Sequence, residues 1–181
     1  MTEKTWTDET WEKRDDVIYR CEVSALYHRK RERFFSNGQR IANVLALTFG
    51  AIGFSSIAST GFGISMAVIA AAVAIISIVF GWSDRATAHA GFAARFITLR
   101  AEIEAAGVVS DHQIDLFSAR ALAIESEEPP ALSALVRICQ NELARASGHL
   151  THVQPLRCWE RLGAQFVDFQ RLSTTRDPRP A

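Results

Sequence analysis

The side chains that could do chemistry in this chain are few, and they form no catalytic or metal-binding pattern. His149 and His152 lie three residues apart with Cys158 downstream, whereas a zinc site needs four protein ligands, or three and a water molecule. Glu127 and Glu128 are adjacent and precede two prolines, which is typical of a helix start because carboxylates complement the helix dipole there. The sequence contains no glycine-rich phosphate loop and no Ser-His-Asp or Cys-His arrangement. We therefore expect no enzyme activity, no metal ion and no cofactor.

A long block without ionisable side chains dominates the sequence. The chain has 181 residues with 20 basic and 20 acidic side chains, but none of these, and no histidine, falls within residues 41–83. A soluble domain of average composition would carry several charges in such a window. The hydrocarbon core of a bilayer is roughly 30 Å thick and takes about 20 helical residues to cross, so the block fits two crossings. We place them at Ile41–Thr60 and Phe62–Trp82, with a turn at Ser59–Gly63 and an interfacial tryptophan at the end. The alternative is a buried helical hairpin in a soluble core.

Polar side chains are concentrated in the first predicted span. Such hydroxyl groups often bond to a carbonyl of the preceding helical turn, or they could line a water path if several hairpins assembled around an axis. The pore-lining candidates are Asn43, Thr48, Ser55 and Ser59. The absence of charged groups from both spans argues against a proton relay or an ion-coupled transporter.

Small side chains recur at helical spacing in the second predicted span. Steps of three and four residues place them on one face, and small faces let membrane helices approach closely. We expect this stripe to pack the second helix against the first. Its members are Gly63, Ala67, Ala70, Ala74, Ser77 and Gly81.

Basic residues flank the block on its two outer sides, whereas the predicted turn between the spans has no charge. Those before the first span are Arg29, Lys30, Arg31, Arg33 and Arg40, and Arg85 follows the second. This asymmetry predicts a multi-pass protein of the inner membrane with both termini in the cytoplasm. The segment His28–Arg33 could also lie against anionic lipid headgroups, or contact a partner that carries nucleic acid. The balanced charge of the whole chain argues against direct nucleic-acid binding.

The remainder of the chain reads as helix, because apolar residues recur at helical spacing and sustained strand patterns are absent. The stripes are Phe92, Phe96, Leu99 and Ile103, ended by Gly107; Ile114, Phe117, Ala121 and Ile124, capped by Ser110 or Asp111; Leu132, Leu135, Cys139 and Leu143, ended by Gly148; and a last helix from near Pro155 with Leu156, Trp159, Leu162, Phe166 and Phe169 facing inward. We expect an all-α protein in which these helices form a small cytoplasmic bundle. The expected parts are a cytoplasmic N-terminal helix (1–40), the transmembrane hairpin (41–83), a cytoplasmic helical region (84–173) and a flexible tail (174–181).

The three cysteines, Cys21, Cys139 and Cys158, are far apart and odd in number. A secreted disulfide framework normally has a dense and even set, so we expect free thiols in a reducing compartment. Cys139 lies on an apolar stripe, which predicts a buried thiol.

Two short segments, together with the arrangement of the chain, resemble a known family. The segment Tyr27–Phe35, the charge-free hairpin and the long helical C-terminal region resemble the SLATT group of two-span bacterial membrane proteins, as do Glu128–Pro130 and Cys139–Leu143. This resemblance implies a non-enzymatic membrane effector of anti-phage systems, paired with a nucleotide-signal synthase or a reverse transcriptase. Such an effector would oligomerise, permeabilise the inner membrane on infection and arrest the cell, as in abortive infection.

Two functions follow as hypotheses. The first is a homo-oligomeric effector that forms a pore in the lipid bilayer or disrupts it. The second is a non-conducting membrane scaffold, whose helices recruit a cytoplasmic enzyme while the hairpin only anchors the chain.

Overall fold

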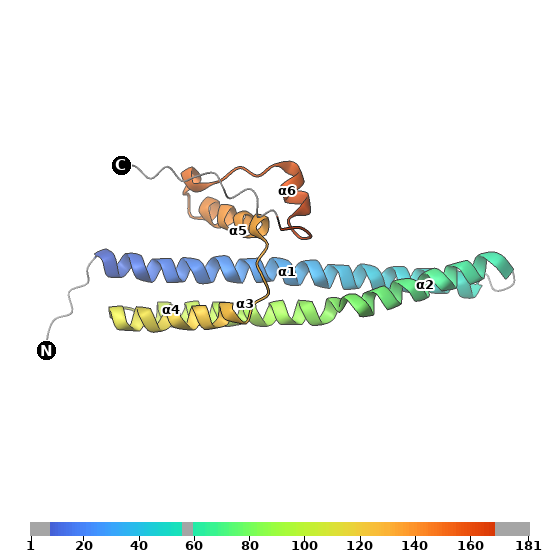
Figure 1. Ribbon diagram of the computed structural model, residues 1–181, viewed down its shortest axis with the longest axis horizontal. Helices are drawn as coiled ribbons and strands as arrows, with labels where there is room; N and C mark the ends of the chain where they lie inside the picture. The colour runs from blue at the N-terminus through green and yellow to red at the C-terminus, as the bar shows by residue number, and fades with distance from the viewer. Residues whose placement is uncertain (1–7, 56–59, 169–181) are drawn as a thin grey trace. The chain divides into compact units, whose positions relative to one another are not determined.

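The computed structural model describes residues 8–55 and 60–168, and every regular element in this part of the chain is a helix (Figure 1). The elements are α1 (Asp8–Ser55), α2 (Thr60–Phe80), α3 (Trp82–Ala105), α4 (Asp111–Ser126), α5 (Ser133–Ala146), the short 3-10 helix η1 (Leu150–His152) and α6 (Cys158–Gly163). The prediction of an all-α protein is confirmed. Ser59, Phe169 and the predicted tail 174–181 lie outside the described residues.

The chain divides into two compact units, and two helices contribute to both. Unit 1 comprises Met1–His28 and Phe92–Ala181, and unit 2 comprises Arg29–Gly91. The helix expected in residues 1–40 is not separate from the first predicted span, because α1 continues without a break from Asp8 to Ser55.

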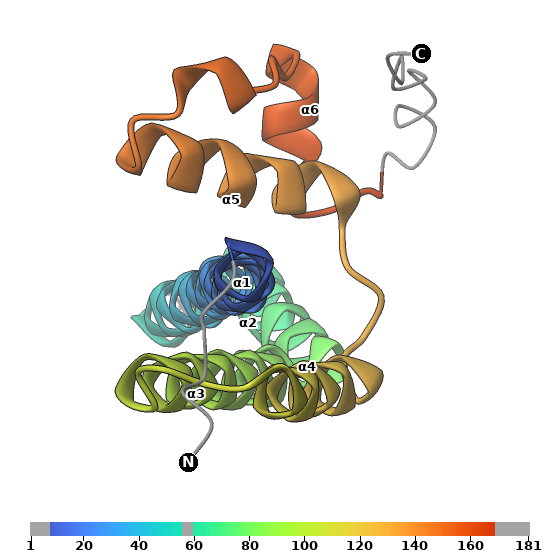
Figure 2. The ribbon, with the colours of Figure 1, turned by 90° about the vertical axis from the view of Figure 1, so that its left-hand side faces the viewer.

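Unit 1 is built in three layers with α1 in the middle, as Figure 2 shows: α3 and α4 lie on one side of α1, and α5 and α6 on the other. The first core fills the space between α1, α3 and α4. Three of the predicted stripe residues, Phe96, Leu99 and Ile103, are at most 1% exposed, so this stripe is confirmed. The other core members are Val17, Cys21, Ala25, Val109, Ile114, Ala121 and Ile124.

The second core lies on the opposite side of α1 and joins it to α5. Its members are Val23, Tyr27, Ala134, Leu135, Cys139 and Ala164. The prediction for the last helix is wrong here, because Trp159, Leu162 and Phe166 are 48%, 80% and 72% exposed. The helix α6 has only six residues, too few to present a stripe that reaches Phe166. Its N-terminus is capped by Glu160, whose carboxylate accepts the Arg157 amide at 2.8 Å.

Three predicted helix ends in unit 1 are confirmed, whereas the last helix begins at Cys158 and not near Pro155. Ser110 caps α4, since its hydroxyl accepts the Gln113 amide at 3.3 Å while the Gln113 side chain accepts the Ser110 amide at 2.8 Å. Gly107 and Gly148 adopt φ angles of 60° and 77° after α3 and α5. Glycine takes these left-handed angles without steric cost, which is why helices so often end on it.

Ion pairs connect the helices of unit 1. Arg20 pairs with Glu125, and Arg100 bonds Glu22 at 3.0 Å. Arg95 makes a two-fold contact with Glu127 at 2.7 and 3.0 Å. The hydrogen bonds from Arg95 lower the pKa of the Glu127 carboxyl. The helix start predicted at Glu127 and Glu128 is wrong, because Glu127 is the C-cap of α4 and α5 begins only at Ser133.

A buried polar contact ties α1 to the segment between α4 and α5. His28 is fully buried, with its Nε2 atom 3.0 Å from a carboxylate oxygen of Glu128. Its ring lies 5.2 Å from that of Phe92 and 6.0 Å from that of Phe96. The neighbouring Tyr27 hydroxyl accepts the Leu132 amide at 3.2 Å. His28 opens the basic segment His28–Arg33 but belongs to the core, because it shares a helical face with Cys21 and Ala25.

The three cysteines are free thiols, as expected. Cys21 and Cys139 are completely buried, and burial raises the pKa of the Cys21 thiol to about 11. Cys158 is exposed. Because the thiolate is the reactive form, only Cys158 is suited to labelling in the folded chain.

Candidate membrane-interaction site

Unit 2 is an antiparallel helical hairpin formed by the second half of α1, by α2 and by the start of α3. Two contacts fix its register. Ser77 donates a hydrogen bond to the Gln39 side chain at 3.2 Å, and at the other end Gly53 approaches the backbone of Gly63 and Ala67. A Cβ atom at Gly53 would lie 3.0 Å from the Gly63 oxygen and 3.0 Å from the Ala67 nitrogen, so a side chain there would push the two helices slightly apart.

The turn between the two helices is not where the sequence places it. We predict it at Ser59–Gly63, but α2 already begins at Thr60 and includes both Gly61 and Gly63. Glycine permits a turn without requiring one. Gly63 is instead used for close helix contact with Gly53.

The small stripe is only partly the packing face. Gly63 and Ser77 are buried and Ala70 is half-buried, but Ala67 and Ala74 are exposed. Met66 and Val73 are half-buried in their place, which gives inward positions at alternating steps of three and four, as in coiled-coil packing. Gly81 has a different role, because its φ angle of 56° ends α2 before α3 begins.

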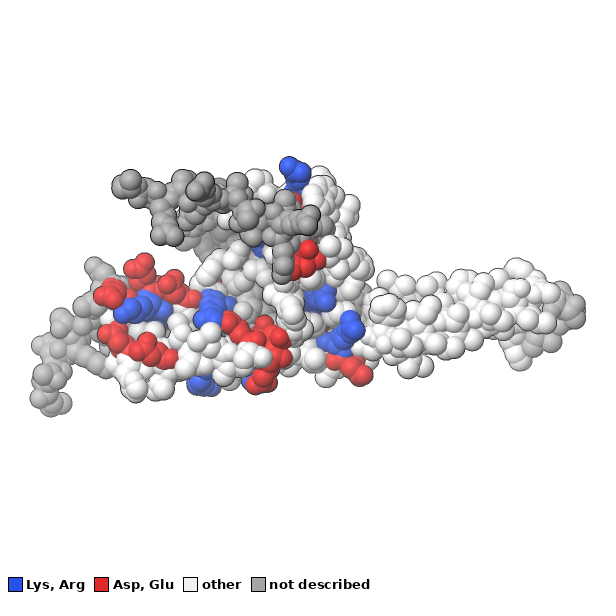
Figure 3. Space-filling view, in the orientation of Figure 1, with Lys and Arg blue, Asp and Glu red and all other residues white. Residues whose placement is uncertain are grey.

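The outer surface of the hairpin is apolar over residues 41–55 of α1 and 61–80 of α2. On the face drawn in Figure 3 it carries no Lys, Arg, Asp or Glu, as expected from residues 41–83. Large side chains are highly exposed along both helices, including Val44, Leu47, Phe54, Ile64, Val68, Ile75, Ile76, Ile78 and Val79. Exposed apolar area costs roughly 25 cal/mol per Å² in water, and patches of this extent mark membrane or protein contact.

One helical stretch in the described residues, Gly61–Ala105, is long and apolar enough to cross a membrane. An 18-residue window within it has a mean hydropathy of 2.6, and 17% of that window is buried. This stretch contains the whole of the second predicted span, Phe62–Trp82. The first predicted span does not meet the same criterion within the described residues, where it ends at Ser55. The second crossing therefore has support from length and composition, and the first stays a prediction.

The pore-lining candidates that can be placed are exposed, and none faces the partner helix. Thr48 donates to the Val44 carbonyl at 2.7 Å, and Ser55 donates to the Ile52 carbonyl at 3.0 Å. The Asn43 side chain accepts a hydrogen bond from Gln39 at 2.8 Å. These hydroxyl protons are used within their own helix, which leaves the oxygen lone pairs at the surface.

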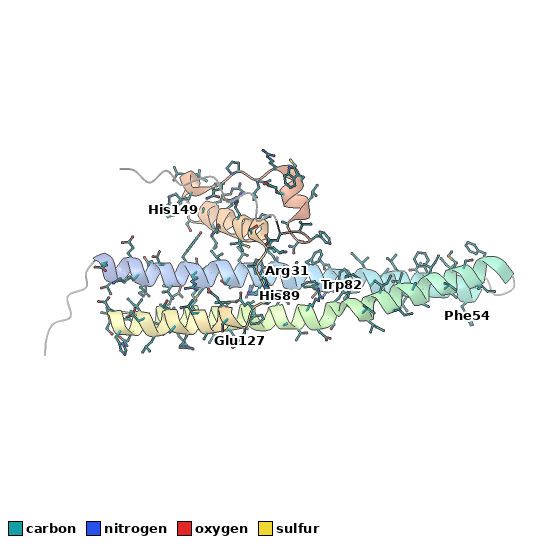
Figure 4. All side chains as sticks on the ribbon, in the orientation of Figure 1. Arg31, Phe54, Trp82, His89, Glu127 and His149 are labelled. Atoms are coloured by element: carbon teal, nitrogen blue, oxygen red, sulfur yellow. The ribbon has the colours of Figure 1, made fainter. Side chains whose placement is uncertain are left out.

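Aromatic and cationic side chains gather at the base of the hairpin, and we call this group the Phe35 cluster. Its members are Arg31, Phe34, Phe35, Trp82, Arg85 and His89, which come from α1 and α3; Figure 4 labels three of them. The guanidinium carbons of Arg31 and Arg85 lie 4.5 and 5.8 Å from the centroid of the Phe35 ring. The His89 ring stacks on Phe35 at 5.6 Å. Cations are attracted to an aromatic face at these distances.

Trp82 fills the centre of the hairpin base. Its ring lies 6.2 Å from that of Phe34 and 6.2 Å from that of Phe80. It also occupies the space beside Gly38, where a Cβ atom would lie 1.3 Å from an indole carbon. Trp82 is the last residue of the second predicted span and the first residue of α3, and its place at the membrane interface stays a prediction.

The predicted basic residues have two kinds of environment. Arg29, Arg33 and Arg40 are exposed, whereas Lys30 and Arg31 are half-buried. Sequence reasoning missed Phe35, Gly38 and Gln39 as parts of the site. The available signal was spacing, because Trp82 and His89 lie two helical turns apart and so share a face.

No metal centre is found in the part of the chain that the structure describes. The rings of His149 and His152 stack with centroids 5.9 Å apart, but no group of three His, Cys, Asp or Glu residues within 8–55 and 60–168 is placed to hold a metal ion. No protein-family model, no curated protein and no solved structure matches this chain.

Proposed function

We propose that this chain is a homo-oligomeric membrane effector, whose hairpin inserts as two antiparallel crossings and permeabilises the inner membrane. The observation that carries this proposal is the apolar outer surface of unit 2, which continues around both α1 and α2. Exposing such an apolar surface to water is unfavourable, whereas exposing it to the hydrocarbon of a membrane is not. The close approach of Gly53 to Gly63 supports a second crossing, because it places α1 alongside the apolar part of α2.

The proposed topology places both termini in the cytoplasm. Exposed basic residues lie at the base of the hairpin, at Arg29, Arg33, Arg40 and Arg85, and no charge lies in its interior or at its tip. Basic residues are retained on the cytoplasmic side of a membrane. Unit 1, with its two cores, would then be the cytoplasmic part that receives the activating signal.

Permeabilisation requires several copies, since two helices cannot enclose a water path. Closed rings are the usual form of homo-oligomers. The hydroxyl groups of Thr48 and Ser55, which share one face of α1, would face the axis, and their unused lone pairs would accept hydrogen bonds from water. In the setting that the SLATT resemblance implies, infection would trigger this assembly and the leak would arrest the cell, with the trigger supplied by a nucleotide-signal synthase or a reverse transcriptase.

The leakage of dye from vesicles tests this function, and Ser55→Leu is the informative variant. Leucine is at least as favourable as serine in hydrocarbon, so insertion should be unchanged while an apolar group replaces a polar lumen position. We expect the purified protein, reconstituted at increasing protein-to-lipid ratio, to release dye, and we expect Ser55→Leu to remove most of that release.

Ser65→Leu is the matched control. Ser65 is an exposed serine of α2 that donates to its own helix at 3.0 Å, as Ser55 does, so this variant should leak like the parent. Equal leakage from parent and Ser55→Leu would contradict a pore lined by α1. No leakage at any protein-to-lipid ratio would contradict permeabilisation.

The scaffold is the second candidate, favoured by one observation. Thr48 and Ser55 satisfy their hydroxyl protons within α1, as they would in a helix that only anchors the chain. A scaffold should tolerate replacement of residues 41–80 by an unrelated apolar hairpin, whereas a pore-forming effector should lose its toxicity in cells.

A further inference from the structure

A groove of about 400 Å³ lies between α3 and α4 in unit 1. The two helices run side by side as one layer of this unit, as Figure 2 shows. Leu99 and Ile124, which belong to the first core, lie in the groove. Ala94, Thr98 and Ala123 also line it, and all three are exposed. This largely apolar groove is therefore open at the surface of the protein.

Two ion pairs bridge α3 and α4 along this groove, and they run in opposite directions. Arg95 of α3 pairs with Glu127 at the end of α4, whereas Arg120 of α4 pairs with Glu102 of α3. On each side of the groove the arginine and the glutamate are seven residues apart, which is about two helical turns. The four side chains are between 42% and 58% exposed, so a second protein can reach them.

This charge pattern is complementary to itself. A two-fold axis along the groove would place α3 of one copy against α4 of another. Arg120 of the first copy would then face Glu102 of the second at the same level, and Arg95 would face Glu127 of the second. A partner with a surface of uniform charge would instead place a like charge against two of these four side chains, which is unfavourable. The pattern therefore favours a second copy of this chain as the partner.

The apolar side chains on this surface fit the same contact. Leu116 precedes Arg120 by four residues and Ala123 by seven, so the three residues share one side of α4. Leu116 is 52% exposed. Pairing of two such surfaces would remove Leu116 and the exposed alanines from water, which favours association. Two-fold contacts of this kind, with the same patch on both subunits, are the commonest in homo-oligomers.

We propose that the α3–α4 groove is the surface through which two copies of this chain pair about a two-fold axis. The inference rests on the proposed function, because it names a contact between copies of the proposed homo-oligomer. The contact lies in unit 1, outside the charge-free block, so the hairpins remain available to build the water path. The arginines and glutamates of the groove fix the register of the pair.

Charge reversal on opposite copies tests this geometry. Arg120→Glu makes that level of the groove entirely acidic, and Glu102→Arg makes it entirely basic. Each variant alone should give a particle of half the parental mass, measured by light scattering in neutral detergent, because four like charges would meet at one level. An equimolar mixture of the two variants should recover the parental mass, because an acidic copy then faces a basic one.

Glu9→Lys and Lys13→Glu are the matched controls. These exposed residues form an ion pair within α1 and do not line the groove, so both variants should keep the parental mass. Exposed ion pairs contribute little to folding, so the circular dichroism of all four variants should match that of the parent. Equal losses of mass in the control variants, or a mixture of Arg120→Glu and Glu102→Arg that stays at half the parental mass, would overturn the pairing.

The mass of the parent distinguishes failure of the interface from failure of the proposed function. If the parent contains several copies and both charge reversals keep its mass, the groove is not the interface and the homo-oligomer stands. If the parent has the mass of one copy in detergent and does not cross-link in vesicles, the homo-oligomer is wrong. The pairing is then overturned with it, and the groove would be open to a different protein.

Discussion

Replacing Gly38 by alanine should lower the thermal midpoint of the detergent-solubilised protein by roughly 6–12 °C. The added methyl group would lie 1.3 Å from an indole carbon of Trp82, and this ring is enclosed by Phe34, Phe35 and Phe80. The ring must therefore leave the hairpin base. Removing a packed tryptophan from its contacts costs about 3–5 kcal/mol, which exceeds the gain of about 0.5–1 kcal/mol from replacing a helical glycine by alanine.

Gly50→Ala is the control, and it should change stability in the opposite direction. Gly50 lies in the same helix, and a Cβ atom there would meet nothing within 4 Å. The variant should keep the helix gain and be slightly more stable than the parent. In a Trp82→Ala background, Gly38→Ala should lose its cost, because the clash is gone. A destabilising Gly38→Ala that persists in that background would contradict this account of the hairpin base.

Placing arginines at Val68 and Ile76 should prevent stable membrane insertion. These side chains are 63% and 53% exposed on α2 and would face lipid. An arginine near the centre of a membrane helix costs about 2.5–3.5 kcal/mol, so the pair should shift the insertion equilibrium by several orders of magnitude. Extraction of isolated membranes at alkaline pH should release the double variant and retain the parent.

Leu116→Arg with Leu122→Arg is the matched control in unit 1. Both leucines are 52% exposed on α4, which lies in the proposed cytoplasmic part, so this variant should remain in the membrane pellet. An increase in solubility, in place of a loss of insertion, would also be informative. If arginines at Val68 and Ile76 instead gave a folded protein that is more soluble without detergent, the apolar surface of unit 2 would be a protein contact rather than a lipid contact.

The sequence predicts unit 1 well where one periodic signal decides the structure. The stripe from Phe92 to Ile103 has a single apolar face, so helix type and burial follow together. The cap at Ser110 and the left-handed Gly107 follow from local chemistry that needs no tertiary context. The prediction for the last helix is wrong because α6 has only six residues, too few for an apolar stripe to determine which side chains are buried.

The hairpin is less predictable from its sequence, for a physical reason. In α2 nearly every side chain is small or aliphatic, so composition alone does not separate the packing face from the lipid face. Which side chains of α2 face α1 depends on where Gly53 of α1 makes its close approach. Met66 and Val73 face inward there, and Ala67 and Ala74 do not. The Phe35 cluster likewise combines residues about fifty positions apart, and no local pattern links Gly38 to Trp82.

The sidedness of thiol labelling tests the central claim most directly. Cys158 is an exposed native thiol, whereas Cys21 and Cys139 are fully buried, so the parent reports one site. In a Cys158→Ser background, Glu9→Cys reports the N-terminal side and Gly61→Cys reports the hairpin tip, where a side chain meets nothing within 4 Å. With a membrane-impermeant maleimide, two crossings predict that Cys158 and Glu9→Cys are labelled in inverted membrane vesicles and protected in intact spheroplasts, and that Gly61→Cys shows the reverse. Labelling of the two terminal sites from opposite faces, or of all three sites in a membrane-free supernatant, would contradict the inserted hairpin.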